Sequence, residues 1–104
     1  MSVVSIYAVF ADREEAERIG RTMVEERLAA CVNILGPIRS IYRWNGKVET
    51  ADECAAIFKT GHRMSDALIE RISALHSYDV PCIESWPIDK ILRSYADWVE
   101  ENVG

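Results

Sequence analysis

The feature that most constrains this chain is the dipeptide Asn45-Gly46, which lies between two runs rich in β-forming residues. Both central residues of a type I′ turn need positive φ, which asparagine and glycine tolerate, so this pair predicts a β-hairpin. Its arms cover residues 38–44 and 47–60. If the second arm is extended throughout, at roughly 3.3 Å per residue it is about 45 Å long.

A ribbon of that length would extend beyond its own domain, because a compact domain of this size has a radius of gyration of only about 13 Å. Overhanging strands expose unpaired backbone N–H and C=O groups, which natural proteins seldom leave bare. Another copy of the chain is the simplest cover, so we expect a homo-oligomer joined partly by β-pairing. The alternative is a bulge or loop at residues 50–53 that divides the second arm in two.

The bulk composition indicates one globular domain that spans residues 1–104. Apolar residues make up 49% of the chain and charged residues 28%, and no apolar run is long enough for a membrane span. The net charge of −5 disfavours nucleic acid and anionic membranes as partners. The first residues resemble a strand and not a secretory leader, which predicts the cytoplasm. Three widely spaced cysteines, Cys31, Cys54 and Cys82, predict buried reduced thiols.

The other segments alternate between strand and helix patterns. Residues 3–10 are almost continuously apolar, as is typical of a central strand. A helix is predicted from Asp12, with Glu15 completing a capping box, to about Ala30. Strand character returns at residues 31–35 and is bent or bulged at Gly36-Pro37. After the hairpin, the pattern predicts a helix at residues 64–75, a strand at residues 82–86 and a helix from Asp89 whose apolar face holds Ile91, Leu92, Tyr95, Trp98 and Val99.

The predicted order is therefore β, α, β, β, α, β and a terminal α. Two split βαβ halves joined by a hairpin predict an α+β fold, the ferredoxin-like plait, in which two helices cover one face of an antiparallel sheet. Residues 3–10 and 31–35 are too apolar for open solvent on the other face. We therefore expect that face to be covered by the third helix or by another subunit.

His76 is the most obvious candidate for chemistry, because it lies at a predicted helix end beside Tyr78 and Asp79. It can cap helix carbonyls, and nothing near it in the sequence completes a metal set or a catalytic triad. Lys59 ends an apolar strand, where a lysine reaches the rim or lies buried against an acid. No catalytic or phosphate-binding motif is present, so we expect no enzymatic activity. The alternative is a small enzyme with a pocket between subunits and with His76 or Lys59 as its base.

Several segments in the right order resemble the CutA divalent-cation tolerance family, and the resemblance covers essentially the whole chain. They are LAACVNI at residues 28–34, IYRWNGKVE at residues 41–49, Glu53 with FKT at residues 58–60, HSYDVP at residues 76–81, and Tyr95 with Trp98. The resemblance implies ferredoxin-like subunits that assemble as trimers through long hairpins, with an architecture similar to that of the PII signalling proteins. It also implies a part in tolerance of, or response to, copper and other divalent metal ions.

Copper in this family has been placed on a cysteine of the first strand and on two adjacent histidines after the second helix. The matching positions here are Ala8, Leu75 and His76, so the resemblance leaves His76 as the one metal ligand of that set. A single imidazole lacks the thiolate partner that Cu(I) prefers. The alternative is a small ligand in a cleft between subunits. The residues expected to line that cleft are Tyr42, Trp44, Lys59, His76 and Tyr78.

Overall fold

The computed structural model describes residues 2–104, which form a four-stranded antiparallel sheet in the order β2-β3-β1-β4 and three α-helices. The elements are β1 (Val3–Phe10), α1 (Arg13–Glu25), β2 (Cys31–Trp44), β3 (Lys47–Gly61), the short 3-10 helix η1 (His62–Met64), α2 (Ser65–Leu75), β4 (Ile83–Pro87) and α3 (Arg93–Glu101). This order and sheet confirm the predicted α+β, ferredoxin-like fold. No helix among the described residues has the length and apolar character needed to cross a membrane.

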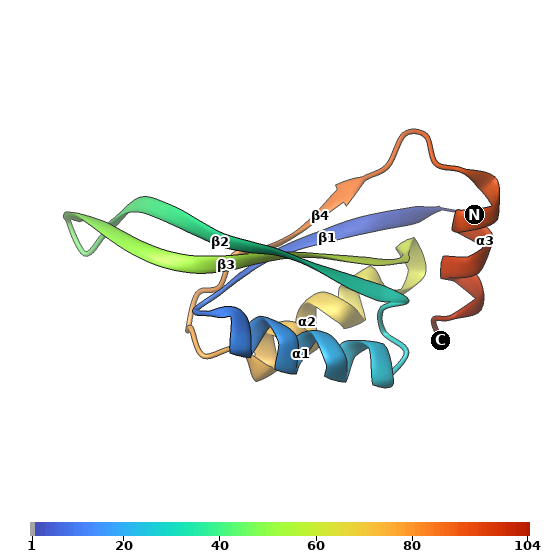
Figure 1. Cartoon of the computed structure of the whole chain (residues 1–104), viewed down its shortest axis with the longest axis horizontal. Helices are drawn as coiled ribbons and strands as arrows, with labels where there is room; N and C mark the ends of the chain where they lie inside the picture. Colours follow the sequence, from blue (N-terminus) through green and yellow to red (C-terminus); the bar gives the residue numbers. More distant parts are fainter. Residues whose placement is uncertain (1) are drawn as a thin grey trace.

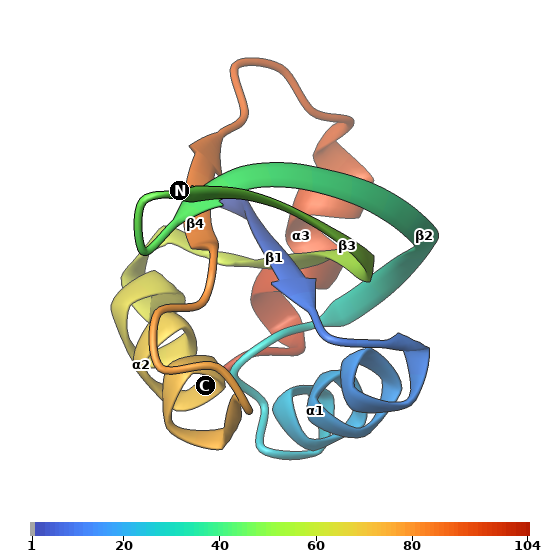
Figure 2. The same cartoon turned by 90° about the vertical axis from the view of Figure 1, so that its left-hand side faces the viewer.

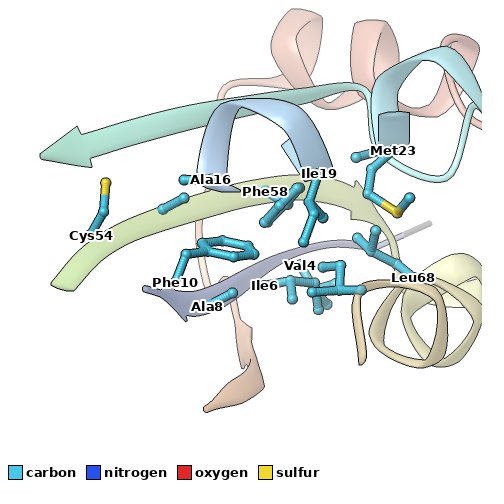
Figure 3. Packing of buried hydrophobic residues seen from close by; sticks show 13 residues of the cluster. Val4, Ile6, Ala8, Phe10, Ala16, Ile19, Met23, Cys54, Phe58 and Leu68 are labelled. Atoms are coloured by element: carbon cyan, nitrogen blue, oxygen red, sulfur yellow. The ribbon is translucent and has the colours of Figure 1, made fainter. Parts of the chain in front are cut away.

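The main core lies between the sheet and the helices α1 and α2, which lie side by side on one face (Figures 1 and 2). Alternate residues of β1, from Val4 to Phe10, point into this core and meet Phe58 of β3 (Figure 3). Ile19 and Met23 of α1, with Leu68 of α2, complete the packing from the helix side (Figure 3). The strand β1 is therefore central to the fold, as its apolar sequence predicted.

The hairpin has the predicted turn, since Asn45 and Gly46 have φ values of 51° and 79° and Trp44 pairs with Lys47. The strand β3 is unbroken from Lys47 to Gly61, so the alternative of an interruption at residues 50–53 is wrong. The molecule measures 45 × 26 × 22 Å, and the hairpin forms its long end (Figure 1). All ten residues from 41 to 50 are exposed in the single chain.

The ribbon is irregular in β2, next to Gly36-Pro37, where a bend or bulge was predicted. The pairing register with β3 shifts between Ile34 and Gly36, so Leu35 is an extra residue in the ladder. Gly36 has a φ of 109°, which glycine adopts without the strain that a side chain would cause. The bulge thus separates the base of β2, against the core, from its exposed outer part.

The helix α1 ends at Glu25, well before the predicted end near Ala30. Arg27 has a φ of 61°, and the N–H of Leu28 donates to the carbonyl of Met23 at 3.0 Å. This left-handed turn closes the helix in the manner of a Schellman motif, with arginine where glycine is usual. The apolar spacing of the sequence continues past the turn, which explains the wrong boundary.

The helix α3 begins at Arg93 and not at Asp89, because the backbone of Leu92 is extended and the preceding residues form a loop. Leu92, predicted to lie on the apolar face of this helix, is 73% exposed. The helix buries Val99 against Val3 at the end of the sheet that carries the N-terminus (Figure 1). Val3 alternates with the core-facing residues of β1, so α3 covers one end of the second sheet face, as expected.

The three cysteines differ in their surroundings, although all are free thiols. Cys54 is buried in the main core, as predicted. Cys31 is half-buried, and its sulfur lies 3.4 Å from the hydroxyl of Tyr95. Cys82 is exposed, so the prediction of a buried thiol is wrong there. It lies in the loop just before β4, which begins one residue later than predicted and is an edge strand of the sheet.

Candidate functional site

A cavity of about 570 Å³ lies on the sheet face opposite α1 and α2. Tyr7 and Val9 of β1 form its floor, because they alternate with the residues that point into the main core. The outer part of β2 forms one wall, with Tyr42 and Trp44. The loop between α2 and β4 forms the facing wall, and the cavity therefore joins segments from both halves of the fold.

Three of the residues that the sequence placed in a ligand cleft line this cavity together, namely Tyr42, Trp44 and Tyr78. Lys59 does not line it, because Lys59 lies further along β3, opposite Cys31 in the ladder, and is half-buried there. His76 does not line it either, but it lies directly behind the wall that Tyr78 forms.

Both ring nitrogens of His76 are occupied within the chain. Nδ1 accepts a hydrogen bond from the backbone N–H of Tyr78 at 3.0 Å, so the proton is on Nε2, which lies 2.8 Å from the carbonyl oxygen of Val9. The ring also stacks on Phe10, with centroids 5.1 Å apart. His76 thus bonds β1 and not the carbonyls of its own helix, and it fixes the loop that carries Tyr78.

The hydroxyl of Tyr78 donates a hydrogen bond to Oε2 of Glu53 at 2.8 Å, which links the loop to β3 across the cavity. Burial first, and then the bond to Glu53 and its negative charge, raise the pKa of Tyr78 to about 12. The hydroxyl therefore remains protonated at neutral pH and keeps its role as donor. Sequence reasoning missed this pair, because 25 residues separate its members.

Glu15 links the start of α1 to the loop between α2 and β4, and the sequence predicted only its part in the cap of α1. The predicted cap is present, since Oδ1 of Asp12 accepts from the N–H of Glu15 at 2.8 Å. The buried Glu15 carboxylate then accepts from the backbone N–H of Ala11 at 3.0 Å and from that of Ser77 at 2.9 Å. It therefore joins the start of α1 to the loop of the cavity, next to His76. Burial alone would raise the pKa of Glu15, but the hydrogen bonds from Ala11 and Ser77 outweigh it and lower the pKa.

We expect Glu15→Gln to lower the free energy of unfolding by about 1–3 kcal/mol, because glutamine offers one acceptor oxygen to the two N–H groups of these part-buried hydrogen bonds. The folded-state pKa of Glu15 is depressed, so its contribution is present above the unfolded pKa of about 4.3 and is lost as the pH falls through the lower folded value. Urea unfolding at neutral and acidic pH measures both effects. The exposed neighbour provides the control, Glu14→Gln, and equal stability of the two variants would contradict the assignment.

The copper ligands implied by the family resemblance do not fit this chain. Ala8 is fully buried in the main core and Leu75 packs against that core, so neither position offers a donor atom. His76 uses both ring nitrogens internally. Across residues 2–104, no three His, Cys, Asp or Glu side chains are grouped closely enough to hold a metal ion. One chain alone therefore supplies no complete metal site in the part that the structure describes.

Comparisons with known proteins agree with this fold. Residues 4–102 match the family model described as CutA1 divalent ion tolerance protein. The chain is 47% identical to the divalent-cation tolerance protein CutA of Thermus thermophilus, and the match covers 88% of each protein. Two solved structures are similar throughout. The periplasmic divalent cation tolerance protein CutA from Archaeoglobus fulgidus has a TM-score of 0.94 at 42% identity, over 98% of this chain and 99% of that one. CutA from Xylella fastidiosa has a TM-score of 0.96 at 36% identity, over the full length of both chains.

Proposed function

The chain belongs to the CutA1 divalent ion tolerance family, and on that basis we propose that it acts as a non-enzymatic homotrimer in tolerance of, or response to, divalent metal ions, copper included. Its relatives are named for tolerance and not for a reaction. The observation that carries the proposal is the hairpin, whose exposed apolar surface needs a partner. The trimer would place the cavity beside a neighbouring subunit.

The apolar surface of the ribbon supports assembly. Leu35 is 56% exposed, Ile41 is 72% exposed and Val48 is 64% exposed in the single chain. Ile41 and Val48 lie on one face of the ribbon, and exposed apolar side chains grouped in this way mark an interaction surface. The strand β2 is also at the edge of the sheet, so one side of its backbone is open to pairing with another chain. A second copy would bury the apolar side chains and pair the open backbone at once.

Ligand binding between subunits is the finer part of the proposal. A metal ion, copper or another divalent cation, would need donors from more than one subunit, because residues 2–104 of one chain do not group three suitable side chains. A small ligand would use the cavity with Tyr42, Trp44 and Tyr78. Lys59 would join that cleft only if a neighbouring subunit brought it there.

The enzymatic alternative gains no support from the geometry of its two candidate bases. His76 has both ring nitrogens in hydrogen bonds within the chain, and Lys59 is outside the cavity. We also propose that the protein is cytoplasmic, because three cysteines that form no disulfide suit a reducing compartment. The description of the similar Archaeoglobus fulgidus protein as periplasmic counts against this proposal.

Calorimetric titration of the assembled protein with Cu(II), Cu(I) and Zn(II) tests the metal proposal. We expect at least one cation to bind with micromolar or tighter affinity. His76→Ala should bind it equally well, because the imidazole nitrogens face Val9 and Tyr78 and not an open site. Circular dichroism would confirm that the variant is folded. Absence of binding to the wild type would contradict direct metal recognition, and loss of binding in a folded variant would make His76 a ligand.

A further inference from the structure

We propose that the cavity between the outer part of β2 and the α2–β4 loop binds a small organic cation, of the amine or quaternary ammonium class. The inference deepens the proposed function, on which it rests, by assigning a ligand class to the same cleft. Its size suits such a ligand, because small-molecule pockets usually measure about 300–1,000 Å³ and this one measures about 570 Å³.

The walls of the cavity are aromatic. Tyr7, Tyr42, Trp44 and Tyr78 contribute four rings from β1, β2 and the loop. The face of an aromatic ring attracts a cation through its quadrupole, and the attraction is strongest for a weakly hydrated cation that loses little on leaving water. Two rings are held in place before any ligand arrives. Tyr7 stacks on Trp86 with centroids 4.7 Å apart, and Tyr78 is bonded to Glu53.

The charged groups in the cavity are all acidic. Glu53 and Asp79 line it, whereas no lysine, arginine or histidine does. Neither carboxylate takes part in an ion pair within residues 2–104. The negative charge also affects the pKa of the Cys82 thiol, which lies at the cavity wall. Partial burial of the sulfur first, then the carboxylate of Glu84, which lies outside the cavity, and that of Glu53, raise the pKa of Cys82. The cavity thus combines a negative potential with apolar walls.

This combination discriminates between classes of ligand. An anion would meet two carboxylates without a basic partner. A bare divalent ion is coordinated by several hard oxygen donors. Within residues 2–104, no three His, Cys, Asp or Glu side chains lie close enough together to hold one. A neutral apolar molecule would leave the carboxylates uncompensated. An alkylammonium ion satisfies both features, because its alkyl groups contact the rings while its charge faces Glu53.

Choline and 3,3-dimethylbutan-1-ol provide a matched pair of probes, because they share one shape and only choline carries a charge. We expect calorimetric titration of the wild-type protein to show choline binding at millimolar or tighter affinity, with the neutral analogue at least about tenfold weaker. Glu53→Gln should weaken choline binding about tenfold while its amide oxygen still accepts from Tyr78. Asp52→Asn is the control, because Asp52 precedes Glu53 on β3, points to the other face and should leave affinity unchanged.

Equal binding of the two probes, binding of neither, or equal affinity of Glu53→Gln and wild type would overturn the inference. Light scattering and metal titration on the same sample separate it from the proposed function. If the trimer forms and binds metal but not choline, only the assignment of an organic cation fails. If choline binds a protein that neither assembles nor binds metal, the proposed function fails and the cavity assignment stands.

Discussion

Replacing Ile41 and Val48 together by aspartate is expected to convert the assembled protein into folded single subunits. Both side chains are on one face of the ribbon, since Ile41 pairs with Thr50 and Val48 pairs with Arg43 in the same register. They are 72% and 64% exposed in the single chain, so the substitutions remove little from its own packing. An interface that buries them would instead have to bury two unpaired carboxylates, at a cost of several kcal/mol each.

Light scattering measures this outcome as a fall in mass from three subunits to one, with an unchanged far-ultraviolet circular dichroism spectrum. Leu92→Asp is the matched control, because Leu92 is 73% exposed but directly precedes α3, which lies at the opposite end of the molecule from the hairpin turn (Figure 1). The control should remain trimeric. A wild-type protein of single-subunit mass, or a double variant that still assembles, would contradict the role given to the hairpin.

Phe58→Ala is expected to have the largest effect on stability, with a loss of about 3–5 kcal/mol in the free energy of unfolding. Phe58 is fully buried in β3, and its ring lies 6.3 Å from that of Phe10 in the middle of the main core (Figure 3). Removal of the ring leaves a cavity between the sheet and both helices. Since a domain of this kind is stable by only about 5–15 kcal/mol, the variant should be close to unfolding.

Urea unfolding at one fixed subunit concentration measures this loss, because assembly makes apparent stability depend on concentration. Ile57→Ala is a suitable control. Ile57 is the preceding residue, points to the opposite sheet face and is half-buried, so its truncation should cost less. Equal losses for the two variants would mean that the main core does not dominate the stability of the fold.

The sequence predicted those features that depend on neighbouring residues. The turn at Asn45-Gly46 follows from the backbone preferences of two adjacent residues, and the structure has positive φ at both. The cap at Asp12 is equally local, since it bonds the residue three positions later. The order of strands and helices followed from apolar periodicity, and that order was sufficient to predict the sheet.

The helix boundaries were less predictable because they depend on contacts between distant parts of the chain. Arginine in a left-handed conformation costs about 1–2 kcal/mol, so no local rule would end α1 at this position. The side chain of Arg27 bonds the carbonyls of Glu101 and Gly104, at 2.9 Å and 2.8 Å, which offsets that cost. The start of α3 likewise depends on where Val99 can reach the end of the sheet.

In the candidate site, too, local features were predictable and contacts between distant residues were not. Tyr42 and Trp44 have the two-residue spacing that places them on one face of a strand, so their proximity was predictable. The bonds from Glu15 to Ser77 and from His76 to Val9 join residues 62 and 67 positions apart. No periodicity encodes such pairs, and the cavity depends on them. The homotrimer stays a prediction, because a single chain cannot show which surface its neighbour covers.

The extra residue at Leu35 decides which side of the ribbon displays the aromatic rings. Before the bulge, Val32 and Ile34 turn toward the helices, whereas after it the even-numbered Tyr42 and Trp44 turn away from them. If β2 kept all of its residues but alternated regularly, even-numbered side chains would face the helices throughout, and both rings would lie on the reverse side. The bulge at Leu35 thus inverts the alternation in the outer half of β2, and the proposed ligand cavity lies on the face where the two rings emerge.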